Sequence, residues 1–298
     1  MTAITATQPP VDPRAPFLVE STTVDAMTEI APETFLCRLR SQAIAAAIQP
    51  GQFMMVRLDG RDSPLIARPF AFYRIVDRDG VAVDEIEFVF LRKGAFTTAL
   101  SRAPRGTPLA IWGPLGNAFS NHPCETLVMA VGGIGQTPML LLAQEALGAR
   151  AFGLVRRPTH WAQRVVMVYG ARTAAALSCV DDFRAAGIDV HLCTDDGSIG
   201  PPQRVPDRLF ELLDGDLNPA TTRVVTCGPE PMMEIVATGC QKRAIDCQVS
   251  METPMACGIG ICFSCVAKIR TQPHKSDDWD YRRTCTEGPI FDADQVVW

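Results

Sequence analysis

The distribution of cysteine constrains this chain more than any other feature of its sequence. There are 11 cysteines among 298 residues, an odd number that disulfides alone cannot pair. A chain of this length needs no disulfides to stabilise its core, whereas small secreted domains do. Seven cysteines are scattered between Cys37 and Cys247, and the last four are gathered towards the C-terminus. The sequence therefore predicts a C-terminal module with a cysteine chemistry of its own, in a reducing compartment.

The last four cysteines follow the pattern C-x4-C-x2-C-x19-C: Cys257, Cys262, Cys265 and Cys285. This is the spacing of plant-type [2Fe-2S] ferredoxins, in which one short loop supplies three thiolates to two irons. Gly258 and Gly260 allow backbone N–H groups to approach the sulfurs closely. Structural zinc is usually held by cysteine pairs with two to four residues between them. The spacing thus favours a cluster over zinc or free thiols.

The first part of the chain has the pattern of β-strands. Ile86, Phe88 and Phe90 alternate with Glu85, Glu87 and Val89. Alternation with a period of two is typical of a strand. Turn pairs such as Pro50-Gly51 interrupt the apolar segments of residues 17–122. Short strands with frequent turns indicate a barrel or a sandwich.

The pattern changes near residue 125. Continuous apolar runs cover residues 127–131, 165–169, 190–193 and 223–226, and helix-like stretches such as 139–147 separate them. Such runs are typical of a parallel sheet that helices cover on both faces. We expect four parts in the chain: a flexible tail at 1–16, a β-rich domain at 17–122, an α/β domain at 123–246 and a cysteine-bearing domain at 247–298. We interpret the arginine-rich connection at 149–164 as solvated, and the sequence assigns it no function.

A glycine-rich turn follows the first apolar run of the α/β part. It reads Gly-Gly-Ile-Gly-Gln-Thr-Pro over residues 132–138. Glycines between a strand and a helix let a phosphate approach the N–H groups at the helix N-terminus. Pro138 stands where the usual dinucleotide fingerprint has its last glycine. The turn predicts either a dinucleotide site or close packing of the backbone, and the sequence leaves both open.

Cys227, Gly228 and Pro229 follow the last apolar run of the α/β part. They are expected at the carboxyl edge of the sheet, where open α/β sheets bind ligands. A buried cysteine before a Gly-Pro turn, with no ligand, is the alternative.

Arg68 opens another short motif, Arg68-Pro-Phe-Ala, in the β-rich part. An arginine beside an aromatic residue is suited to neutralise a phosphate and to flank a planar ring. A single arginine in a strand is more often a surface residue, so this motif depends on its context.

Composition excludes several kinds of partner. The chain is 47% hydrophobic and 20% charged, with a formal net charge of -5, as expected of a compact globular protein. Nucleic acids and anionic membranes are bound mainly by clustered Lys and Arg, which this sequence lacks. It also lacks an apolar run of the roughly 18 residues that span a bilayer, and residues 1–16 do not have the form of a secretory signal. We expect a cytoplasmic protein that binds neither nucleic acid nor membranes.

Taken in order, the motifs resemble one family. Arg68-Pro-Phe-Ala, Gly113-Pro-Leu-Gly-Asn, the turn at 132–138, Cys227-Gly-Pro and the C-terminal cysteines are similar to the ferredoxin-NADP reductase superfamily with an appended [2Fe-2S] domain. Over residues 17–298 the chain resembles the electron-transfer subunits of NAD-dependent (class B) dihydroorotate dehydrogenases. The resemblance implies a multidomain fold: an antiparallel β-barrel for FAD, an α/β domain with a parallel sheet for NAD, and a small [2Fe-2S] domain.

By this resemblance, two segments of the barrel bind FAD. They supply Arg68, Pro69, Phe70, Ala71, Val89, Phe90, Leu91, Phe96 and Thr97. The family usually has Ser or Thr at the position of Ala71, Arg near Leu91 and Gly near Phe96. Here Arg92 and Gly94 lie close to the last two positions. These departures put individual contacts in question, but not FAD binding itself.

The resemblance also assigns NAD and the reacting group. NAD would be bound by Gly132, Gly133, Gly135, Thr137, Pro138, Gly228 and Pro229. Cys227 would be the catalytic residue, beside the site of hydride transfer. The family implies NAD rather than NADP, but Arg172 is placed to meet a 2′-phosphate, so the residues leave this choice open.

The implied activity is electron transfer between a partner and NAD. NAD takes two electrons as a hydride, whereas an iron–sulfur cluster passes one at a time, so a flavin is needed between them. The resemblance implies electrons from the reduced FMN of a partner dihydroorotate dehydrogenase subunit, in pyrimidine biosynthesis. A barrel that oxidises dihydroorotate takes about 250 residues. We therefore expect it on a separate chain, in a heterotetramer.

Two alternatives differ in their prediction for the metal or the partner. The first alternative is the NADH-dependent reductase component of an oxygenase or of a hydrogenase-type complex, which sends electrons outwards from NADH. Oxygenase reductases generally have a longer gap before the fourth cysteine, so the x19 spacing disfavours them. A zinc-bearing interaction module without enzymatic activity is the second alternative.

Overall fold

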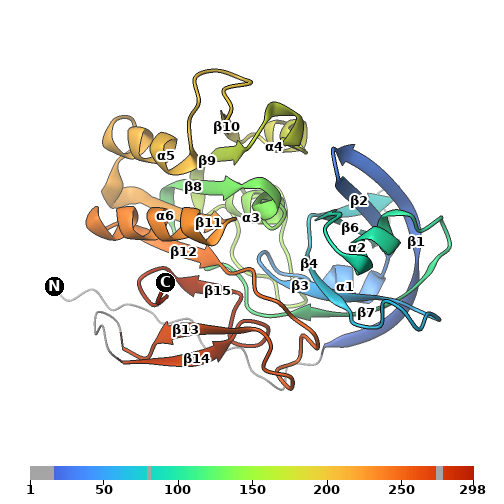
Figure 1. Cartoon of the computed structure of the whole chain (residues 1–298). Coiled ribbons are helices and arrows are strands. Elements are labelled where there is room, and N and C mark those ends of the chain that lie inside the picture. The colour runs from blue at the N-terminus through green and yellow to red at the C-terminus, as the bar shows by residue number, and fades with distance from the viewer. Residues whose placement is uncertain (1–16, 79–81, 273–277) are drawn as a thin grey trace.

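Two sheets dominate the chain, and a smaller one lies near its C-terminus (Figure 1). The computed structural model describes residues 17–78, 82–272 and 278–298. The predicted tail at 1–16 lies outside the described residues. No helix within these ranges is both long enough and apolar enough to cross a membrane.

The N-terminal sheet has seven strands in the order β4-β3-β7-β1-β2-β6-β5. All its neighbouring strands are antiparallel. The strands are β1 (Leu18–Ala31), β2 (Thr34–Arg40), β3 (Phe53–Leu58), β4 (Arg68–Ala71), β5 (Arg74–Arg78), β6 (Ala82–Leu91) and β7 (Pro108–Leu115), and the short helices are α1 (Gln42–Ala47) and α2 (Ala95–Ser101). Since β4 and β5 are its edges, we describe it as a curled antiparallel sheet.

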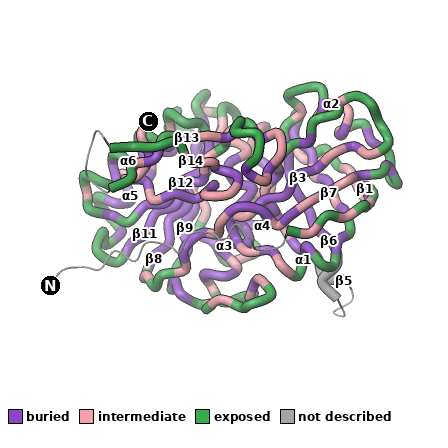
Figure 2. The backbone as a smooth tube through the Cα atoms, turned by 90° about the horizontal axis from the view of Figure 1, so that it is seen from below, coloured by how far each residue is buried: buried purple, intermediate pink, exposed green. Residues whose placement is uncertain are grey.

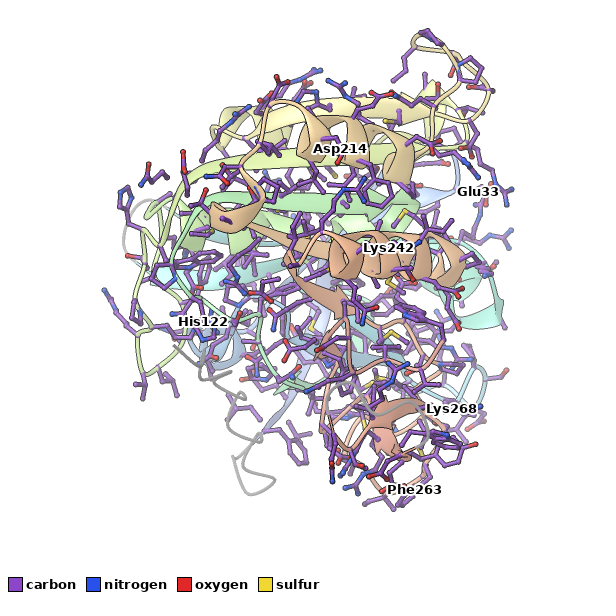
Figure 3. The ribbon with its side chains drawn as sticks, turned by 90° about the vertical axis from the view of Figure 1, so that its left-hand side faces the viewer. Glu33, His122, Asp214, Lys242, Phe263 and Lys268 are labelled. Carbon is purple, nitrogen blue, oxygen red and sulfur yellow. The ribbon has the colours of Figure 1, made fainter. Side chains whose placement is uncertain are left out.

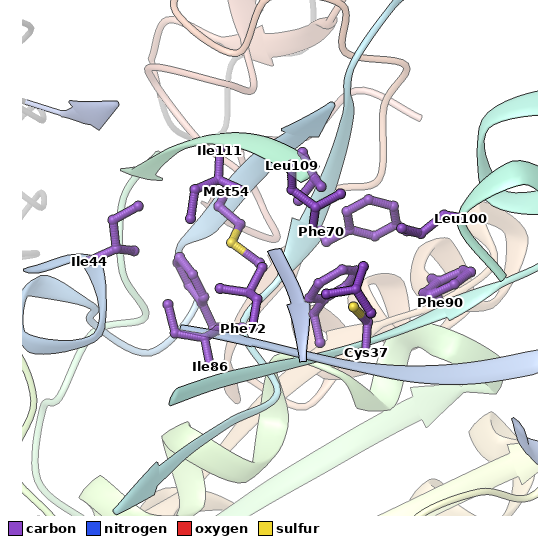
Figure 4. Packing of buried hydrophobic residues seen from close by; sticks show 14 of the residues in the cluster. Cys37, Ile44, Met54, Phe70, Phe72, Ile86, Phe90, Leu100, Leu109 and Ile111 are labelled. Carbon is purple, nitrogen blue, oxygen red and sulfur yellow. The ribbon is translucent and has the colours of Figure 1, made fainter. Parts of the chain in front are cut away.

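Aromatic packing holds the curled sheet in its shape. Phe70 of β4 and Phe88 of β6 lie far apart in the strand order, yet their ring centroids are 4.8 Å apart. Phe70 also packs against Phe90 and Phe96, at 5.7 and 6.1 Å. The close view of this core shows Phe70, Phe90 and Met54 converging from different strands (Figure 4). Burying these rings places β4 opposite β6 and the start of α2.

The second sheet has six strands in the order β10-β9-β8-β11-β12-β15. They are β8 (Cys124–Gly132), β9 (Ala162–Ala171), β10 (Asp189–Thr194), β11 (Thr222–Cys227), β12 (Asp246–Ser250) and β15 (Ile290–Asp292). Its strands are parallel, except that β15 runs antiparallel to β12. The accompanying helices are α3 (Met139–Ala146), α4 (Val180–Ala185), α5 (Val205–Asp214) and α6 (Glu230–Lys242), with 3-10 turns at Gly133–Gln136, Ala174–Ala176 and Pro219–Thr221.

Helices cover both faces of this sheet, which explains its continuous apolar strands. Leu127 and Met129 of β8 pack in one core with α3 and α4. Val128 of the same strand packs in the opposite core with α5 and α6. The buried strands β8, β9 and β11 lie together at the centre of this half of the molecule (Figure 2). The predicted parallel sheet is therefore present, with one antiparallel edge strand.

The cysteine-bearing segment contributes to the second sheet as well as to its own. Its two-stranded sheet consists of β13 (Val266–Arg270) and β14 (Trp279–Arg283). Strands β12 and β15, however, pair with each other inside the six-stranded sheet, where Val249 is opposite Phe291. Both side chains are buried in the core with α5 and α6. The domain limits stay a prediction, but a limit at 246 would separate β12 from its hydrogen-bonded neighbour β11.

Buried carboxylates connect the two large sheets. The sequence alternation in β6 suggests an apolar and a polar face, yet Glu87 is fully buried. Its carboxylate accepts hydrogen bonds from Arg38 Nε at 2.9 Å and from Arg74 Nε at 2.7 Å. Arg74 Nη1 also donates to Asp182 of α4 at 3.1 Å, and the Tyr73 hydroxyl donates to the Asp182 carboxylate at 2.6 Å. The polar face of β6 is buried because it faces the second sheet, and Val89 of this face packs in the core that contains α3 and α4.

The connection between α3 and β9 is anchored by a buried ion pair. Glu145 of α3 is fully buried, and Arg157 pairs with it through Nε at 3.1 Å. Arg157 also donates to the carbonyl oxygen of Phe119 at 2.8 Å. Leu154 and Val155 are 78% and 83% exposed, so the predicted solvation holds only for the middle of this connection.

Replacing Arg157 by methionine should lower the free energy of unfolding by about 3–5 kcal/mol, because it leaves the buried Glu145 carboxylate without its cation. Urea unfolding measures this loss. The control is Arg156→Met, since Arg156 is exposed and its neighbour Arg157 makes the buried contacts. Similar unfolding midpoints for both variants would show that the buried pair does not anchor the connection.

Candidate functional site

A cavity of about 770 Å³ lies between the curled sheet and the carboxyl edge of the six-stranded sheet. Sites for small molecules and cofactors commonly enclose roughly 300–1,000 Å³. All residues that the sequence assigned to FAD line this cavity: Arg68, Pro69, Phe70, Ala71, Val89, Phe90, Leu91, Phe96 and Thr97. They come from β4, β6 and α2, which the aromatic core holds opposite one another. Their individual contacts with a flavin stay a prediction.

One of the two arginines that the sequence suggested for the flavin site lies outside the cavity lining. Arg92 forms an ion pair with Glu33, and its guanidinium lies over the ring of Phe35. It does not belong to the residues that line the cavity, whereas Lys93 and Gly94 do. The Lys93 N–H donates to the Thr97 hydroxyl at 2.9 Å. Lys93 is therefore a better candidate than Arg92 for attracting a phosphate.

Arg68 lines the cavity, and backbone carbonyls just before β4 hold its side chain. Its Nη1 donates to the carbonyl oxygens of Ile66 at 3.2 Å and Ala67 at 2.9 Å. These bonds hold the guanidinium at the rim of the cavity. They engage Nη1 alone, so the other N–H groups do not bond to these two carbonyls. A rim guanidinium with a fixed direction is suited to bind an oxyanion.

The glycine-rich turn and the Cys227-Gly-Pro turn interlock. A Cβ atom on Gly135 would lie 2.2 Å from the Cys227 carbonyl oxygen, and one on Gly132 would lie 2.9 Å from Pro229. Gly228, with a φ of +147°, would place a Cβ 2.9 Å from the Gly132 nitrogen. These three glycines are required for close packing of the two turns, which is the alternative that the sequence left open.

Gly133 differs from the other glycines of the turn. Its φ is +55°, and a Cβ there would meet no atom within 4 Å. Its backbone therefore borders open space, as a dinucleotide site requires. Thr137 and Pro138 line the cavity, and α3 begins directly after them. The turn thus combines close packing with one open position, and NAD binding at its predicted residues remains a prediction.

Cys227 lies at the carboxyl end of β11 and lines the cavity. Its Sγ is 3.8 Å from Glu252 Oε1. Burial, together with the nearby Glu252 carboxylate, raises the pKa of the Cys227 thiol well above its usual range. Burial likewise raises the pKa of Glu252. Cys227 therefore presents a neutral thiol at neutral pH, and its predicted role beside the site of hydride transfer stays a prediction.

The sequence did not single out Glu252, although one signal pointed to it. It follows β12 by two residues, and that strand ends at the same sheet edge as β11. Residues Met251–Ala256 all line the cavity. They lead directly into the segment 257–265, which carries three of the four C-terminal cysteines and is named the cysteine loop. The run between a buried strand and a ligand loop is therefore where additional site residues are expected.

The four C-terminal cysteines form two pairs of thiols. Cys257 lies close enough to Cys262 to help lower the pKa of its thiol, and Cys265 lies close enough to Cys285 to add to the rise in pKa that burial causes there. The first pair is nearer the solvent, since Cys262 is exposed and Cys257 is partly exposed, whereas Cys265 and Cys285 are buried. No group of three or more His, Cys, Asp or Glu side chains in the described ranges is arranged to hold a single metal ion. Two thiol pairs fit two irons with two thiolates each.

Backbone N–H groups point at these sulfurs, as the glycine pattern predicts. The Ile259 N–H donates to Cys257 Sγ at 3.4 Å, and the Gly260 backbone partly offsets the rise that burial causes in the pKa of Cys285. Gly258 and Gly260 have φ values of +73° and +81°, which L-residues with a side chain rarely adopt. The loop conformation thus depends on glycine. Such N–H donors stabilise the negative charge that a metal–thiolate cluster carries.

The Cys262 thiol is the most acidic of the four. Hydrogen bonds from the Ser264 hydroxyl, the Ser264 N–H and Cys257 lower its pKa to about 6. The distance from Cys262 Sγ to Ser264 Oγ is 3.2 Å. A thiol with this pKa is mostly deprotonated at neutral pH, which is the form that binds metals.

The cysteine loop is docked on the curled sheet beside the cavity. Cys265 and Cys285 share a buried apolar cluster with Phe53, Met55 and Leu115 of β3 and β7. Trp112 of β7 donates from Nε1 to the Cys257 carbonyl oxygen at 2.9 Å. Since Ala256 and Ser264 also line the cavity, the cavity and the cysteine loop share a wall.

The other side of the loop faces outwards. Ile261 and Phe263 are 74% and 62% exposed, and Phe263 lies at the outer end of the molecule (Figure 3). The Arg283 guanidinium packs over the Phe263 ring and also donates to the Gly260 carbonyl oxygen at 3.2 Å. Arg283 thereby supports the loop from β14.

Solved structures share the fold of this chain. One is a chain of the NADH-dependent reduced ferredoxin-NADP oxidoreductase, with a TM-score of 0.73, 23% identity and coverage of 93% of this chain and 90% of that chain. Phthalate dioxygenase reductase is similar with a TM-score of 0.58 and 13% identity, over 90% and 94% of the two chains. At these identities the likeness shows the fold alone, in which a curled antiparallel sheet is joined to an α/β sheet.

Sequence relatives identify the family. The family model for the iron-sulfur cluster binding domain of dihydroorotate dehydrogenase B matches residues 252–297. The dihydroorotate dehydrogenase B (NAD(+)), electron transfer subunit of Desulforamulus reducens is 31% identical over 274 residues, 92% of this chain and 96% of the relative. The protein of the same name from Geobacillus kaustophilus is 31% identical, over 93% and 98% of the two chains. The chain therefore belongs to the family of dihydroorotate dehydrogenase B electron transfer subunits.

Proposed function

We propose that this protein transfers electrons from a dihydroorotate-oxidising partner to NAD through a [2Fe-2S] cluster and FAD. FAD occupies the cavity, the four C-terminal cysteines hold the cluster, and NAD binds at the edge formed by the glycine-rich turn and Cys227. The observation that carries the proposal is the shared wall: Ala256 and Ser264 line the cavity and flank the cysteine loop. The cluster, which passes one electron at a time, and FAD, which also exchanges two, would therefore be neighbours.

The chain's own residues would bind and orient these groups. Phe70 and Phe90 line the cavity with apolar surface, and Arg68 and Lys93 provide its cations. Cys227 and Glu252 lie where the cavity meets the carboxyl edge of the parallel sheet, so a nicotinamide there would contact a neutral thiol. When bound, the flavin supplies the exchange between single electrons and hydride. In this proposal the curled sheet is the FAD-binding barrel. The three domains span residues 17–122, 123–246 and 247–298.

The relatives are named as electron transfer subunits, which implies a separate catalytic subunit in their enzymes. We extend this to the present chain: its partner is an FMN-containing dihydroorotate dehydrogenase subunit, the assembly is a heterotetramer and its location is the cytoplasm. Purification of the natively expressed protein tests this part. Recovery of a dihydroorotate-oxidising flavoprotein with the chain is expected, whereas recovery of an oxygenase component would contradict it.

Cofactor analysis tests the core of the proposal. We expect one FAD, two irons and two acid-labile sulfides per chain, because two thiol pairs suit the two irons of one [2Fe-2S] cluster. Flavin is measured by absorbance after release, and iron, zinc and sulfide by elemental and colorimetric analysis. A colourless protein with one zinc and no flavin would contradict the proposal and support the interaction module instead.

A further inference from the structure

Ser264 belongs to both halves of the site. It lines the cavity, and its hydroxyl lies 3.2 Å from the Cys262 sulfur. Cys262 is the most exposed of the four cysteines, at the solvent side of the loop. Ser264 thus borders the cavity and contacts the sulfur, so its hydrogen bond can stabilise negative charge on that sulfur.

The hydrogen bonds of Ser264 leave its hydroxyl hydrogen available to the Cys262 sulfur. The Ala256 N–H donates to Ser264 Oγ at 3.2 Å, so one lone pair of this oxygen is already engaged. The hydroxyl hydrogen is then free to point at the Cys262 sulfur. A cysteine that ligates iron has no proton to give, so in the loaded protein the hydroxyl must be the donor of this bond.

From these contacts we propose that Ser264 is a positioning residue that raises the reduction potential of the cluster through its hydrogen bond to the Cys262 thiolate. The inference rests on the proposed function, because it requires that the four cysteines hold a cluster. Reduction adds one negative charge to the cluster, and a hydrogen bond from a fixed donor is stronger to the more negative sulfur. The donor therefore stabilises the reduced form more than the oxidised form.

The bond also has a direct consequence for the direction of electron flow. A higher potential makes the cluster a better acceptor for electrons from a partner and a weaker donor towards the cavity. Ser264 thus sets the balance between these two steps from a position that borders both. Since the hydroxyl is held by a backbone N–H of the same loop, the balance does not depend on a distant part of the chain.

A redox titration of the full-length, cluster-loaded protein tests the inference. We expect Ser264→Ala to hold as much iron as the wild type, but to show a reduced-to-oxidised cluster ratio about tenfold lower at a given potential, equivalent to about 59 mV for one electron. Electron paramagnetic resonance of the reduced cluster reports the ratio. Ser264→Thr keeps the hydroxyl and should restore the wild-type value. The flavin midpoint should not move in either variant.

Ser101→Ala serves as the matched control. The Ser101 hydroxyl donates within α2 to the Thr98 carbonyl oxygen, and Ser101 does not belong to the cavity lining. Its cluster potential should equal that of the wild type.

Each other outcome has a definite meaning. An unchanged cluster potential in Ser264→Ala overturns the inference and leaves the proposed function intact. Loss of the cluster in Ser264→Ala but not in Ser264→Thr also overturns it, because the hydroxyl would then hold the loop together rather than tune the sulfur. A wild-type protein without iron would instead refute the proposed function, on which the inference depends.

Discussion

Cys262→Ala is expected to abolish reduction of NAD by the partner while leaving oxidation of NADH by an artificial acceptor. Cys262 lies on the exposed side of the loop, so alanine there creates no cavity in the core. It removes one of the two thiols of the solvent-side pair. Changes outside the ligands already lower metal affinity or activity about 10–100-fold. Loss of a ligand should therefore reduce the partner-linked rate by more than about 100-fold.

The measurement compares two activities of the same preparation. Partner-linked NAD reduction needs the cluster, whereas NADH oxidation by ferricyanide needs only the flavin and the dinucleotide site. Cys124→Ala is the control, because Cys124 begins β8 at the end opposite the glycine-rich turn. It should keep both activities. An equal loss of both in Cys262→Ala would contradict the proposed order of carriers.

Gly135→Ala is expected to disable the dinucleotide site. The added Cβ would lie 2.2 Å from the Cys227 carbonyl oxygen and 2.8 Å from the Gly228 nitrogen, and both are backbone atoms. The two turns must then move apart. Overpacking of this kind costs about 1–3 kcal/mol of stability. A displacement of about 1 Å at a reacting centre lowers a rate about 100-fold.

Steady-state oxidation of NADH with an artificial acceptor measures the rate, and urea unfolding measures the stability. Gly200→Ala is the matched control, because a Cβ at Gly200 would meet no atom within 4 Å and its backbone is not in the left-handed region. We expect it to match the wild type. If Gly135→Ala kept the same rate as Gly200→Ala, the contact between the two turns would not matter for the dinucleotide site.

The sequence predicts best what depends on neighbouring residues. The cysteine spacing is local, and the structure brings these thiols together in two pairs. The alternation in β6 and the apolar runs of β8, β9 and β11 follow from periodicities of the backbone itself, and the structure has strands there. The residues assigned to FAD also share one cavity, since three segments of the curled sheet supply them.

Tertiary contacts explain what the sequence did not predict. Glu87 is polar and alternates with apolar residues, yet it is fully buried and paired with two arginines. Arg92 resembles a flavin ligand by position, but Glu33 from the turn between β1 and β2 binds it. Glu252 reaches the cavity only because β12 ends beside β11. None of these partners lies near its residue in the sequence, so no local pattern records them.

The pairing of Ser250 with Ile290 has a consequence for how this protein can vary. The chain leaves the six-stranded sheet after Ser250 and returns to the adjacent strand position at Ile290. Everything between these residues, the cysteine loop included, is therefore an insertion whose two ends meet. Closing such a loop costs little more when residues are added to it. Residues added beyond Arg270 and before Trp279, at the ends of β13 and β14 away from Cys265 and Cys285, should therefore leave the sheet and the cavity unchanged, which makes this end of the hairpin the place to graft a reporter or a tether.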